Sequence, residues 1–513
     1  MACHENYGKA VQILQLNDDH SFSLNESQLE AILLDDRVKD KPVAVVSVAG
    51  TYRQGKSFLL AFFLRFFQNK CQSEWLDNPR IPLGGFEWKP GSRLHTTGIL
   101  LWSVPFLVTT PEGEEVVVLL MDTQGSFDCK STVEECTTIF ALSIMISSVQ
   151  VYNIFRNIQE DHLQHLQFSS EYGRLAQEET GVVPFQRLVF LVRDWPFNEE
   201  ADFGAEGGHS VLQECLKIMD EQHDELRGLR RQIWSCFSQI DCFLMPRPGD
   251  KVETDYCFEG SLMDVDNNFK QKVQELVHWL LAPENLAPKK INGQKITCEE
   301  LMKYFRAYAA AFQGGTLPSP KTVLQATAEA SNMAAKEKAT NFYLDAMNRV
   351  PRGDLDKLLE SHAELLEETT QLFKRTPKFG DESVSQSYLG ALTTDLLMHF
   401  ERIYKQEEQF FLIEKGKDEQ RQRERETERQ REEVRQRERE IHRVKEEEWA
   451  LEMESEIESE YETQEAIEQM QLIVSKRQWI SKQISRLSCA SVVITMIIIP
   501  IGLYDLIAKL RKA

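Results

Sequence analysis

The stretch that most constrains the fold is residues 50–57, Gly-Thr-Tyr-Arg-Gln-Gly-Lys-Ser, which fits the glycine, lysine and hydroxyl spacing of a phosphate-binding loop. The β-branched run before it (residues 43–49) predicts a buried strand, and the apolar run after it (residues 58–64) predicts a packed helix. In such a unit backbone N–H groups surround phosphate oxygens, Lys56 supplies a positive charge and Ser57 a ligand for Mg²⁺. The stretch predicts a nucleotide site in an α/β domain with a mostly parallel sheet; the alternative is a chance loop–helix junction.

Length and charge limit the classes of protein to which the chain can belong. With 513 residues the chain exceeds the size of one hydrophobic core, so two or three folded units are expected. A formal net charge of −22 disfavours nucleic-acid binding, because an acidic surface repels phosphate backbones. The ten cysteines include no C-x-x-C pair, which argues against a zinc site or a disulfide framework. No signal-peptide pattern opens the chain, so we expect the nucleotide domain to face the cytosol.

Two threonines, Thr96 and Thr97, stand just before the apolar run of residues 99–107. In P-loop GTPases a threonine at this place closes over Mg²⁺ and the γ-phosphate, and its loop is released after hydrolysis. Thr96 is therefore a candidate metal ligand and catalytic group in a first switch. An ordinary turn before a strand is the alternative for this pair.

A second switch signal follows the apolar run of residues 116–121, which ends in Asp122-Thr123-Gln124-Gly125. An acid at the carboxyl end of a parallel strand can hold Mg²⁺ through water, and the N–H of Gly125 can meet the γ-phosphate. The next residue is Ser126 and not the glutamine that orients water in small GTPases, so another group must assist hydrolysis. Arg53 is the candidate, because a guanidinium inside the phosphate loop can reach the β–γ bridge; a surface arginine is the alternative.

Asp194 is the residue that we expect to read the base, because it follows the apolar run of residues 188–192. A carboxylate can accept both N–H groups on the N1 and N2 edge of guanine, and adenine lacks this donor pair. Arg193 precedes it, and the usual N-K-x-D motif is absent. Taken alone, the Arg-Asp pair would be a structural ion pair.

Taken together, these elements resemble the atlastin family of dynamin-related GTPases, with the guanylate-binding proteins as more distant relatives. The resemblance covers about residues 43–404 and is carried by long motifs: V-A-G-T-Y-R-Q-G-K-S-F (48–58), L-L-M-D-T-Q-G (119–125), Q-V-Y-N (150–153), Q-H-L-Q (164–167), E-Y-G-R-L-A (171–176), F-L-V-R-D-W (190–195) and L-Q-A-T-A-E-A (324–330).

The resemblance implies a GTPase with Mg²⁺ near Ser57, Thr96 and Asp122, and catalytic roles for Arg53, Lys56 and Thr96. It implies a homodimer formed through the nucleotide-loaded domain. Three positions depart from the family pattern: Asp255 replaces Asn in the base cap, and Lys89 and Arg93 replace Arg and Glu in the first switch, which bears on dimer strength. The nucleotide contacts that we expect are Arg53, Gln54, Gly55, Lys56, Ser57, Phe58, Gln124, Gly125, Arg193, Asp194 and Val252, the last in a loop over the base.

Changes of composition predict the domain layout. The segments are an N-terminal extension with one helical piece (1–41), the GTPase domain (42–317), a proline-bounded hinge (318–321), a helical bundle (322–413), a charged helical spacer (414–448), an acidic to amphipathic helix (449–486), a membrane segment (487–504) and a short basic tail (505–513).

The segments after residue 413 carry the membrane prediction. Residues 414–448 hold 13 acids and 12 bases, and their i,i+4 spacing favours a single solvated helix over disorder. The amphipathic stretch of residues 466–487 suits a membrane surface or a partner helix equally. Residues 487–504 lack any charge over 18 positions, enough for about 27 Å of helix. A single-pass tail anchor and a shallow loop bent at Pro500 both remain open.

Two functions follow as alternatives. The first is a membrane-anchored GTPase, which converts GTP to GDP and phosphate and whose dimerisation tethers or fuses membranes, with the endoplasmic reticulum as the expected location. The second is a GTP-binding tether or scaffold with little turnover. In both, the expected partners are GTP or GDP, a second copy of the chain and membrane lipid, and nucleic acid is not among them.

Overall fold

The apolar run before the phosphate loop forms β3 (Val43–Gly50), a strand whose eight residues are all buried. It pairs in parallel with β6 (Glu115–Thr123) and β7 (Val149–Phe155), and β8 (Phe185–Arg193) and β9 (Phe237–Leu244) continue the sheet in parallel. Strands buried on both faces read as continuous apolar runs, which explains the sequence pattern of β3 and β6. Among the described residues the strand order is β2 (Phe22–Leu24), β1 (Ala10–Leu16), β4 (Ile99–Trp102), β6, β3, β7, β8 and β9, with β5 (Phe106–Thr109) beside β6. The prediction of an α/β domain with a mostly parallel sheet is confirmed.

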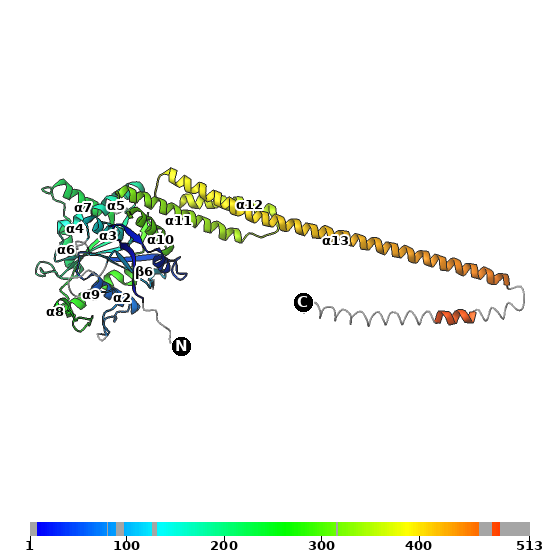
Figure 1. Ribbon diagram of the computed structural model, residues 1–513, viewed down its shortest axis with the longest axis horizontal. Coiled ribbons are helices and arrows are strands. Elements are labelled where there is room, and N and C mark those ends of the chain that lie inside the picture. The colour runs from blue at the N-terminus through cyan, green and yellow to red at the C-terminus, as the bar shows by residue number, and fades with distance from the viewer. Residues whose placement is uncertain are drawn as a thin grey trace. The chain divides into compact units, whose positions relative to one another are not determined.

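A computed structural model of the chain describes residues 8–78, 81–88, 97–125, 131–313, 317–460 and 474–482. The chain divides into one unit up to residue 407 and a second from residue 408 on. The first unit contains the α/β domain, two helices that follow it and the first part of a third (Figure 1).

An antiparallel edge completes the sheet. The sequence predicted only one helical piece in the N-terminal extension, and α1 (Glu26–Leu33) is that helix. The same extension also supplies the hairpin of β1 (Ala10–Leu16) and β2 (Phe22–Leu24), which pairs with β4 (Ile99–Trp102). The further antiparallel strand, β5 (Phe106–Thr109), pairs with β6. The extension is therefore part of the sheet.

Helices cover both faces of the sheet (Figure 1). Val43 and Val45 of β3 belong to a core that includes residues of α3 (Val133–Ile146), α5 (Gln167–Thr180) and α10 (Cys298–Phe312). The alternate residues Ala44 and Val46 belong to a second core with α2 (Lys56–Gln68) and α9 (Asn267–Leu281), as the alternation of a strand requires. The remaining short elements are α4 (Glu160–Gln164), α6 (Ala205–Cys215), α7 (Asp224–Cys236), α8 (Asp250–Thr254), the 3-10 helix Pro283–Asn285, β10 (Lys290–Ile291) and β11 (Gln294–Lys295).

Three helices follow the α/β domain, which confirms the predicted helical region. They are α11 (Pro320–Asn348), α12 (Leu355–Arg375) and the first part of α13 (Glu382–Glu460). Their core includes Tyr343, whose hydroxyl lies 2.6 Å from Nδ1 of His362, and His362 stacks on Phe400 with ring centroids 3.8 Å apart. In the predicted hinge, α11 begins at Pro320 with Ser319 as its N-cap. Movement at this point remains a prediction.

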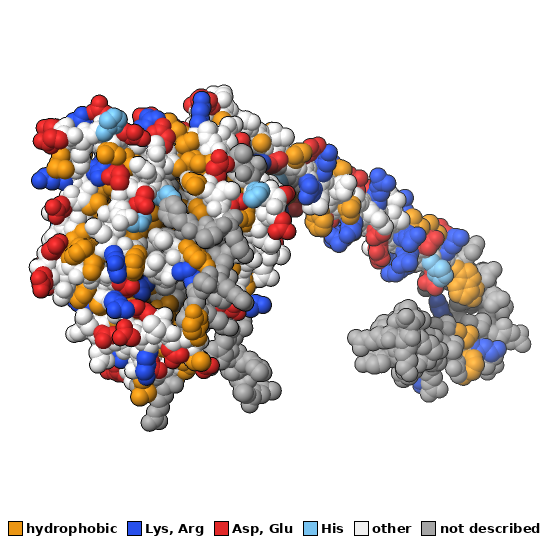
Figure 2. Space-filling view, turned by 60° about the vertical axis from the view of Figure 1, so that its left-hand side comes forward, with side chains coloured by type: hydrophobic (Ala, Val, Ile, Leu, Met, Phe, Trp, Pro, Cys, Tyr) orange, Lys and Arg blue, Asp and Glu red, His pale blue; other side chains and the backbone are white. Residues whose placement is uncertain are grey.

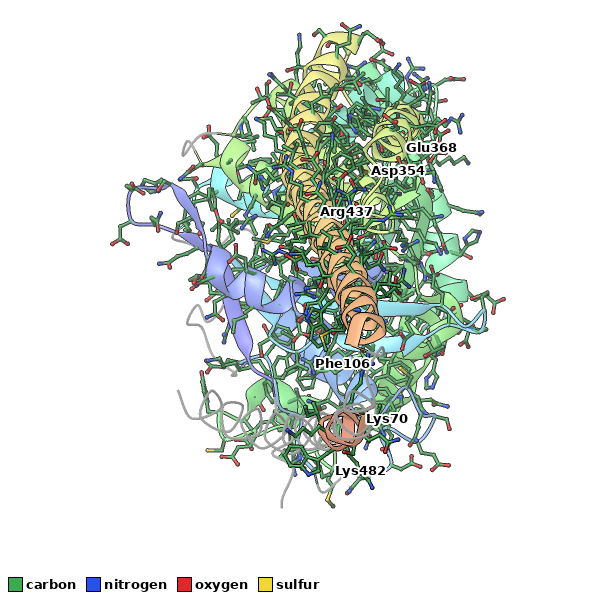
Figure 3. The ribbon with its side chains drawn as sticks, turned by 90° about the vertical axis from the view of Figure 1, so that its right-hand side faces the viewer. Lys70, Phe106, Asp354, Glu368, Arg437 and Lys482 are labelled. Carbon is green, nitrogen blue, oxygen red and sulfur yellow. The ribbon has the colours of Figure 1, made fainter. Side chains whose placement is uncertain are left out.

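The second unit consists, in its described part, of the remainder of α13 and a helical piece at residues 474–482. The predicted spacer, residues 414–448, lies within α13 and its side chains are exposed. Pairs such as Arg421 with Asp418 and Arg443 with Glu447 connect neighbouring turns. Figure 2 shows positive and negative side chains interspersed along this helix, and Figure 3 shows side chains on every visible side of it, Arg437 among them.

The predicted membrane segment, residues 487–504, lies outside the described residues, as does most of the predicted amphipathic stretch. Among the helices that are described, none is long and apolar enough to cross a membrane.

Candidate functional site

The phosphate loop lies between β3 and α2, where the sequence predicted it. Gly50 ends β3 with a φ of +137°, and a Cβ built on it would lie 2.0 Å from the carbonyl oxygen of Asn153 on β7. Only glycine fits there. The loop then turns into α2, which begins at Lys56. The first-turn N–H groups of a helix have no acceptor within it, and the helix dipole favours negative charge at this end, so this terminus suits an anion.

The second predicted motif packs directly on the loop. Lys56 is 7% exposed, and its Nζ donates to the carbonyl oxygen of Thr51 at 3.2 Å. A Cβ built on Gly125 would lie 2.9 Å from this Nζ and 2.5 Å from Cα of Tyr52. The structure therefore brings Lys56 and Gly125 together, and the lack of a side chain at residue 125 is what permits the approach.

Ser57 and Asp122 form the candidate metal site. The strand register pairs Asp122 with Val48, which places the carboxylate at the end of β6 nearest the loop. Ser57 Oγ donates to Asp122 Oδ2 at 2.5 Å, and Asp122 is fully buried. A buried carboxylate beside a hydroxyl supplies the hard oxygen ligands that Mg²⁺ prefers, so these residues fit the ion that the family implies. Thr96, the third predicted ligand, lies outside the described residues.

Arg53 adopts the left-handed conformation, with a φ of +62°. This conformation is uncommon for a residue with a side chain, and such strain gathers at functional sites. The guanidinium carbon lies 5.9 Å from the ring centroid of Tyr52. The role of Arg53 in hydrolysis remains a prediction.

Gln124 connects the two switches. Its Oε1 accepts from the N–H of Gly98 at 2.9 Å, and its Nε2 donates to Ser131 Oγ at 2.5 Å. Its backbone N–H donates to the carbonyl oxygen of Gly98 at 2.8 Å. The sequence predicted a nucleotide contact at Gln124 and did not predict this bridging role of its side chain.

Arg193 joins the base-reading strand to the phosphate loop. The side chain is fully buried, and NH1 donates to the carbonyl oxygens of Gln54 at 3.3 Å and Gly55 at 3.4 Å and to Asn153 Oδ1 at 3.3 Å. Burial lowers the pKa of this guanidinium. Its CZ atom also lies 5.4 Å from the ring centroid of Phe269.

Asp194 follows Arg193 in the left-handed conformation, with a φ of +55°. Burial raises the pKa of its carboxyl, and the nearby charges of Arg193 and Arg247 act in the opposite direction. Among the described residues no ion pair forms on Asp194. The described geometry therefore does not show the alternative, a structural ion pair between Arg193 and Asp194.

The loop over the predicted base site contains α8. Val252 on this helix is half-buried and packs against the second core. Arg247 pairs with Glu253, with Nε 3.0 Å from Oε1. Asp255, which departs from the family pattern, accepts from the N–H of Cys257 at 2.8 Å and so closes a turn after α8.

Two residues show where sequence reasoning fell short. Asn153 is fully buried at the end of β7, and its Nδ2 donates to the carbonyl oxygen of Gln54 at 2.9 Å. The available signal was Asn153 itself, one of two amide residues, with Gln150, in the otherwise apolar and aromatic stretch of residues 149–155. Phe58 was predicted as a nucleotide contact, and the structure places its ring among Phe62, Trp88, Phe258 and Phe269. Its backbone N–H, in the first turn of α2, is the group that remains for a nucleotide.

Known families and curated relatives match most of this chain. The family model "Guanylate-binding protein, N-terminal domain" matches residues 19–290, and "Guanylate-binding protein, C-terminal domain" matches residues 292–411. Atlastin-1 of Bos taurus is 50% identical over 391 residues, which cover 75% of this chain and 70% of that protein. Atlastin-2 of Xenopus laevis is 48% identical over 389 residues, with 75% and 68% covered. The chain therefore belongs to the atlastin family, whose members, like the related guanylate-binding proteins, are GTPases that hydrolyse GTP.

Proposed function

We propose that this chain is a membrane-anchored GTPase whose nucleotide-loaded α/β domain pairs with that of a second copy, so that GTP hydrolysis tethers or fuses two membranes. The observation that carries the nucleotide part is the cluster of Lys56, Ser57, Asp122 and Gly125, with Ser57 Oγ 2.5 Å from Asp122. Membership of the atlastin family and the uncharged run of residues 487–504 support the membrane part.

Binding begins with the charges of the triphosphate. Lys56 and the first-turn N–H groups of α2 hold the phosphates, while Asp194 accepts the N1 and N2 hydrogens of guanine. Ser57 and Asp122, with Thr96, would hold Mg²⁺, which would neutralise negative charge on the phosphates. The burial of Lys56 and Asp122 keeps water away and strengthens both interactions.

Hydrolysis needs a group that meets charge developing on the phosphates. Arg53 carries this role in our proposal, because its strained backbone holds a guanidinium within the phosphate loop itself. Arginines that act in this way raise rates by about 10³ to 10⁵. The chain then needs no arginine from a partner protein.

The membrane step is assigned to the endoplasmic reticulum, as the family resemblance implies. Two features favour the alternative, a tether or scaffold with little turnover. Arg93, where the family has Glu, reverses a charge in the first switch, while Lys89 keeps the positive charge of the family's Arg. In addition, α13 adds a long, exposed, charged helix beyond residue 407.

Liposomes that carry the full-length protein separate these functions. Tethering is followed by light scattering and fusion by lipid mixing, with GTP, a non-hydrolysable analogue or no nucleotide. Lipid mixing with GTP alone supports fusion, and tethering with the analogue but no lipid mixing supports the scaffold. Lys56→Ala is the control that should abolish both, and vesicles that behave alike in all three conditions would refute the proposal.

A further inference from the structure

The hairpin of β1 and β2 contacts the described ends of both candidate switches. Between Gln12 and Leu14 the pairing of β1 with β4 shifts register, as in a β-bulge, and bulges beside active sites re-aim side chains. The carbonyl oxygen of Leu14 lies against Gly98, where φ is +65° and a built Cβ would be 2.0 Å from that oxygen. Only glycine fits there, so the hairpin sits directly on the chain that follows the first switch.

Gln12 holds the end of the first switch. From its half-buried position its Nε2 donates to the carbonyl oxygen of Thr97 at 2.9 Å and to the hydroxyl of Thr97 at 3.1 Å. Thr97 directly follows Thr96, the predicted magnesium ligand. A displacement of Gln12 would therefore be passed to the neighbour of Thr96.

The hairpin makes its second contact with the helix that follows the second switch. His20, in the turn between the two strands, places Nδ1 2.6 Å from Glu135 Oε1. The other oxygen of Glu135 accepts from the N–H of Thr132 at 2.6 Å, in the capping box that begins α3. Glu135 is 3% exposed while His20 is 64% exposed. If this bond were lost, the cost in free energy would therefore arise chiefly from the buried carboxylate of Glu135.

We propose that this hairpin positions the two switch ends relative to each other, so that Gln12 and His20 set the rate of GTP hydrolysis without touching the nucleotide. The contacts close a ring, whose members in order are Gln12, Thr97, Gly98, Gln124, Ser131, Thr132, Glu135 and His20. Small displacements of catalytic groups reduce the stabilisation of the transition state more than the binding of the ground state. The inference rests on the proposed nucleotide site, whose switch ends the ring holds.

Kinetics on the full-length protein test the positioning role. Gln12→Leu and His20→Ala should each lower kcat by about 2- to 10-fold, the equivalent of one hydrogen bond, with unchanged affinity for a fluorescent non-hydrolysable GTP analogue. His20→Gln keeps an N–H donor for Glu135 and should restore kcat. Ser23→Ala is the matched control, because Ser23 Oγ donates to Asn17 Oδ1 at 3.2 Å within the same hairpin and, in the part of the chain that the structure describes, bonds to neither switch.

Hydrogen exchange tests the ring itself. Gln12→Leu should speed exchange of the Thr132 amide, which donates to Glu135, and His20→Ala should speed exchange of the Gly98 amide, which donates to Gln124. The proposal would be overturned if only amides beside the substituted residue exchanged faster. It would also be overturned if Gln12→Leu and His20→Ala had the same kcat as Ser23→Ala. A third contrary result is a fall in kcat accompanied by comparable losses of affinity for the analogue and of melting temperature in these variants.

Lys56→Ala, measured in parallel, distinguishes failure of the ring from failure of the site. If this variant binds and hydrolyses GTP like the unsubstituted protein, the nucleotide site is wrongly placed. The exchange result still decides on the ring in that case, because it depends on contacts within the protein and not on where the nucleotide lies.

Discussion

Replacing Gly50 with alanine tests how tightly the phosphate loop is fixed to the sheet. Gly50 is paired with Asn153 in the register of β3 and β7. The new Cβ would lie 2.0 Å from the carbonyl oxygen of Asn153 and 2.9 Å from its carbonyl carbon, and the φ of +137° disfavours any side chain. The substitution must therefore move β7 away from β3 or displace the loop.

The expected loss of stability combines two effects. A backbone held in a sparsely populated conformation costs about 1–3 kcal/mol, and overpacking of a filled site costs a further 1–3 kcal/mol or so. Together they give about 2–6 kcal/mol, which lowers the melting temperature of a domain of this size by roughly 4–20 °C. Nucleotide affinity should fall as well, because Asn153 also bonds Gln54 at 2.9 Å and passes any displacement to the loop.

Calorimetry of the full-length protein, with and without a non-hydrolysable GTP analogue, measures both effects. Gly228→Ala is the matched control: Gly228 lies within α7, and a built Cβ there meets nothing within 4 Å. Alanine in a helix interior should stabilise by about 0.5–1 kcal/mol. If Gly50→Ala had the same melting temperature as Gly228→Ala and bound the analogue equally well, the close approach of β3 and β7 would be refuted.

Four further substitutions test the site and the core. Lys56→Ala should abolish binding of the GTP analogue, because Lys56 contacts the phosphates of the bound ground state. Arg53→Ala should keep this binding and lose phosphate release, because Arg53 acts on charge that develops in the transition state. Equal losses of binding in both variants would contradict the role of Arg53. Asp194→Asn should weaken GTP by about 1–3 kcal/mol in titrations and narrow the preference over ATP, and an unchanged preference would place base reading elsewhere. Burial lowers the pKa of Lys289 from 10.5 to about 7. Between these two values the unfolded chain binds one more proton than the folded chain, so the free energy of unfolding should rise with pH from about 7 to 10.5. Lys289→Met should remove this rise. If the denaturation midpoints of the two proteins changed equally between pH 7 and pH 9, the lowered pKa of Lys289 would be contradicted.

The motifs of the site could be predicted because each follows an apolar run. Parallel strands bring their carboxyl ends to one edge of a sheet, so the loop after β3, Asp122 on β6 and Asp194 after β8 meet there. Asn153 is held by the same edge, but one polar residue in an apolar run does not reveal its partners. The ring through Gln12 and His20 depends on a β-bulge and on contacts across 85 and 115 positions of sequence, and local patterns do not encode either.

The segment boundaries predicted from composition fall inside a single helix, α13. The predicted boundaries at residues 413 and 448 mark changes from apolar to charged and from charged to amphipathic, yet one helix runs through both. Helices end at proline or at capping signals, and residues 382–460 contain no proline and only two isolated glycines, Gly390 and Gly416. A helix can pass from packed to solvent-exposed surroundings without a break in its backbone. The division of α13 into a bundle helix, a charged spacer and an amphipathic part therefore stays a prediction.

Arg193 explains how the base and the phosphates can be recognised as one unit. The buried Arg193 side chain donates through NH1 to two carbonyl oxygens of the phosphate loop and to Asn153. Burying a guanidinium costs stability unless it is hydrogen-bonded, so these bonds hold Arg193 against the loop. The next residue is Asp194, the proposed base reader, so any movement of this end of β8 should be passed to the predicted phosphate loop. If Asp194 reads the base, a nucleotide with the wrong base leaves its half-buried carboxylate without two N–H donors, and the resulting strain should fall on the carbonyl groups beside Lys56. Base selectivity should therefore appear in turnover as well as in affinity, which a loop and a base pocket held independently would not produce.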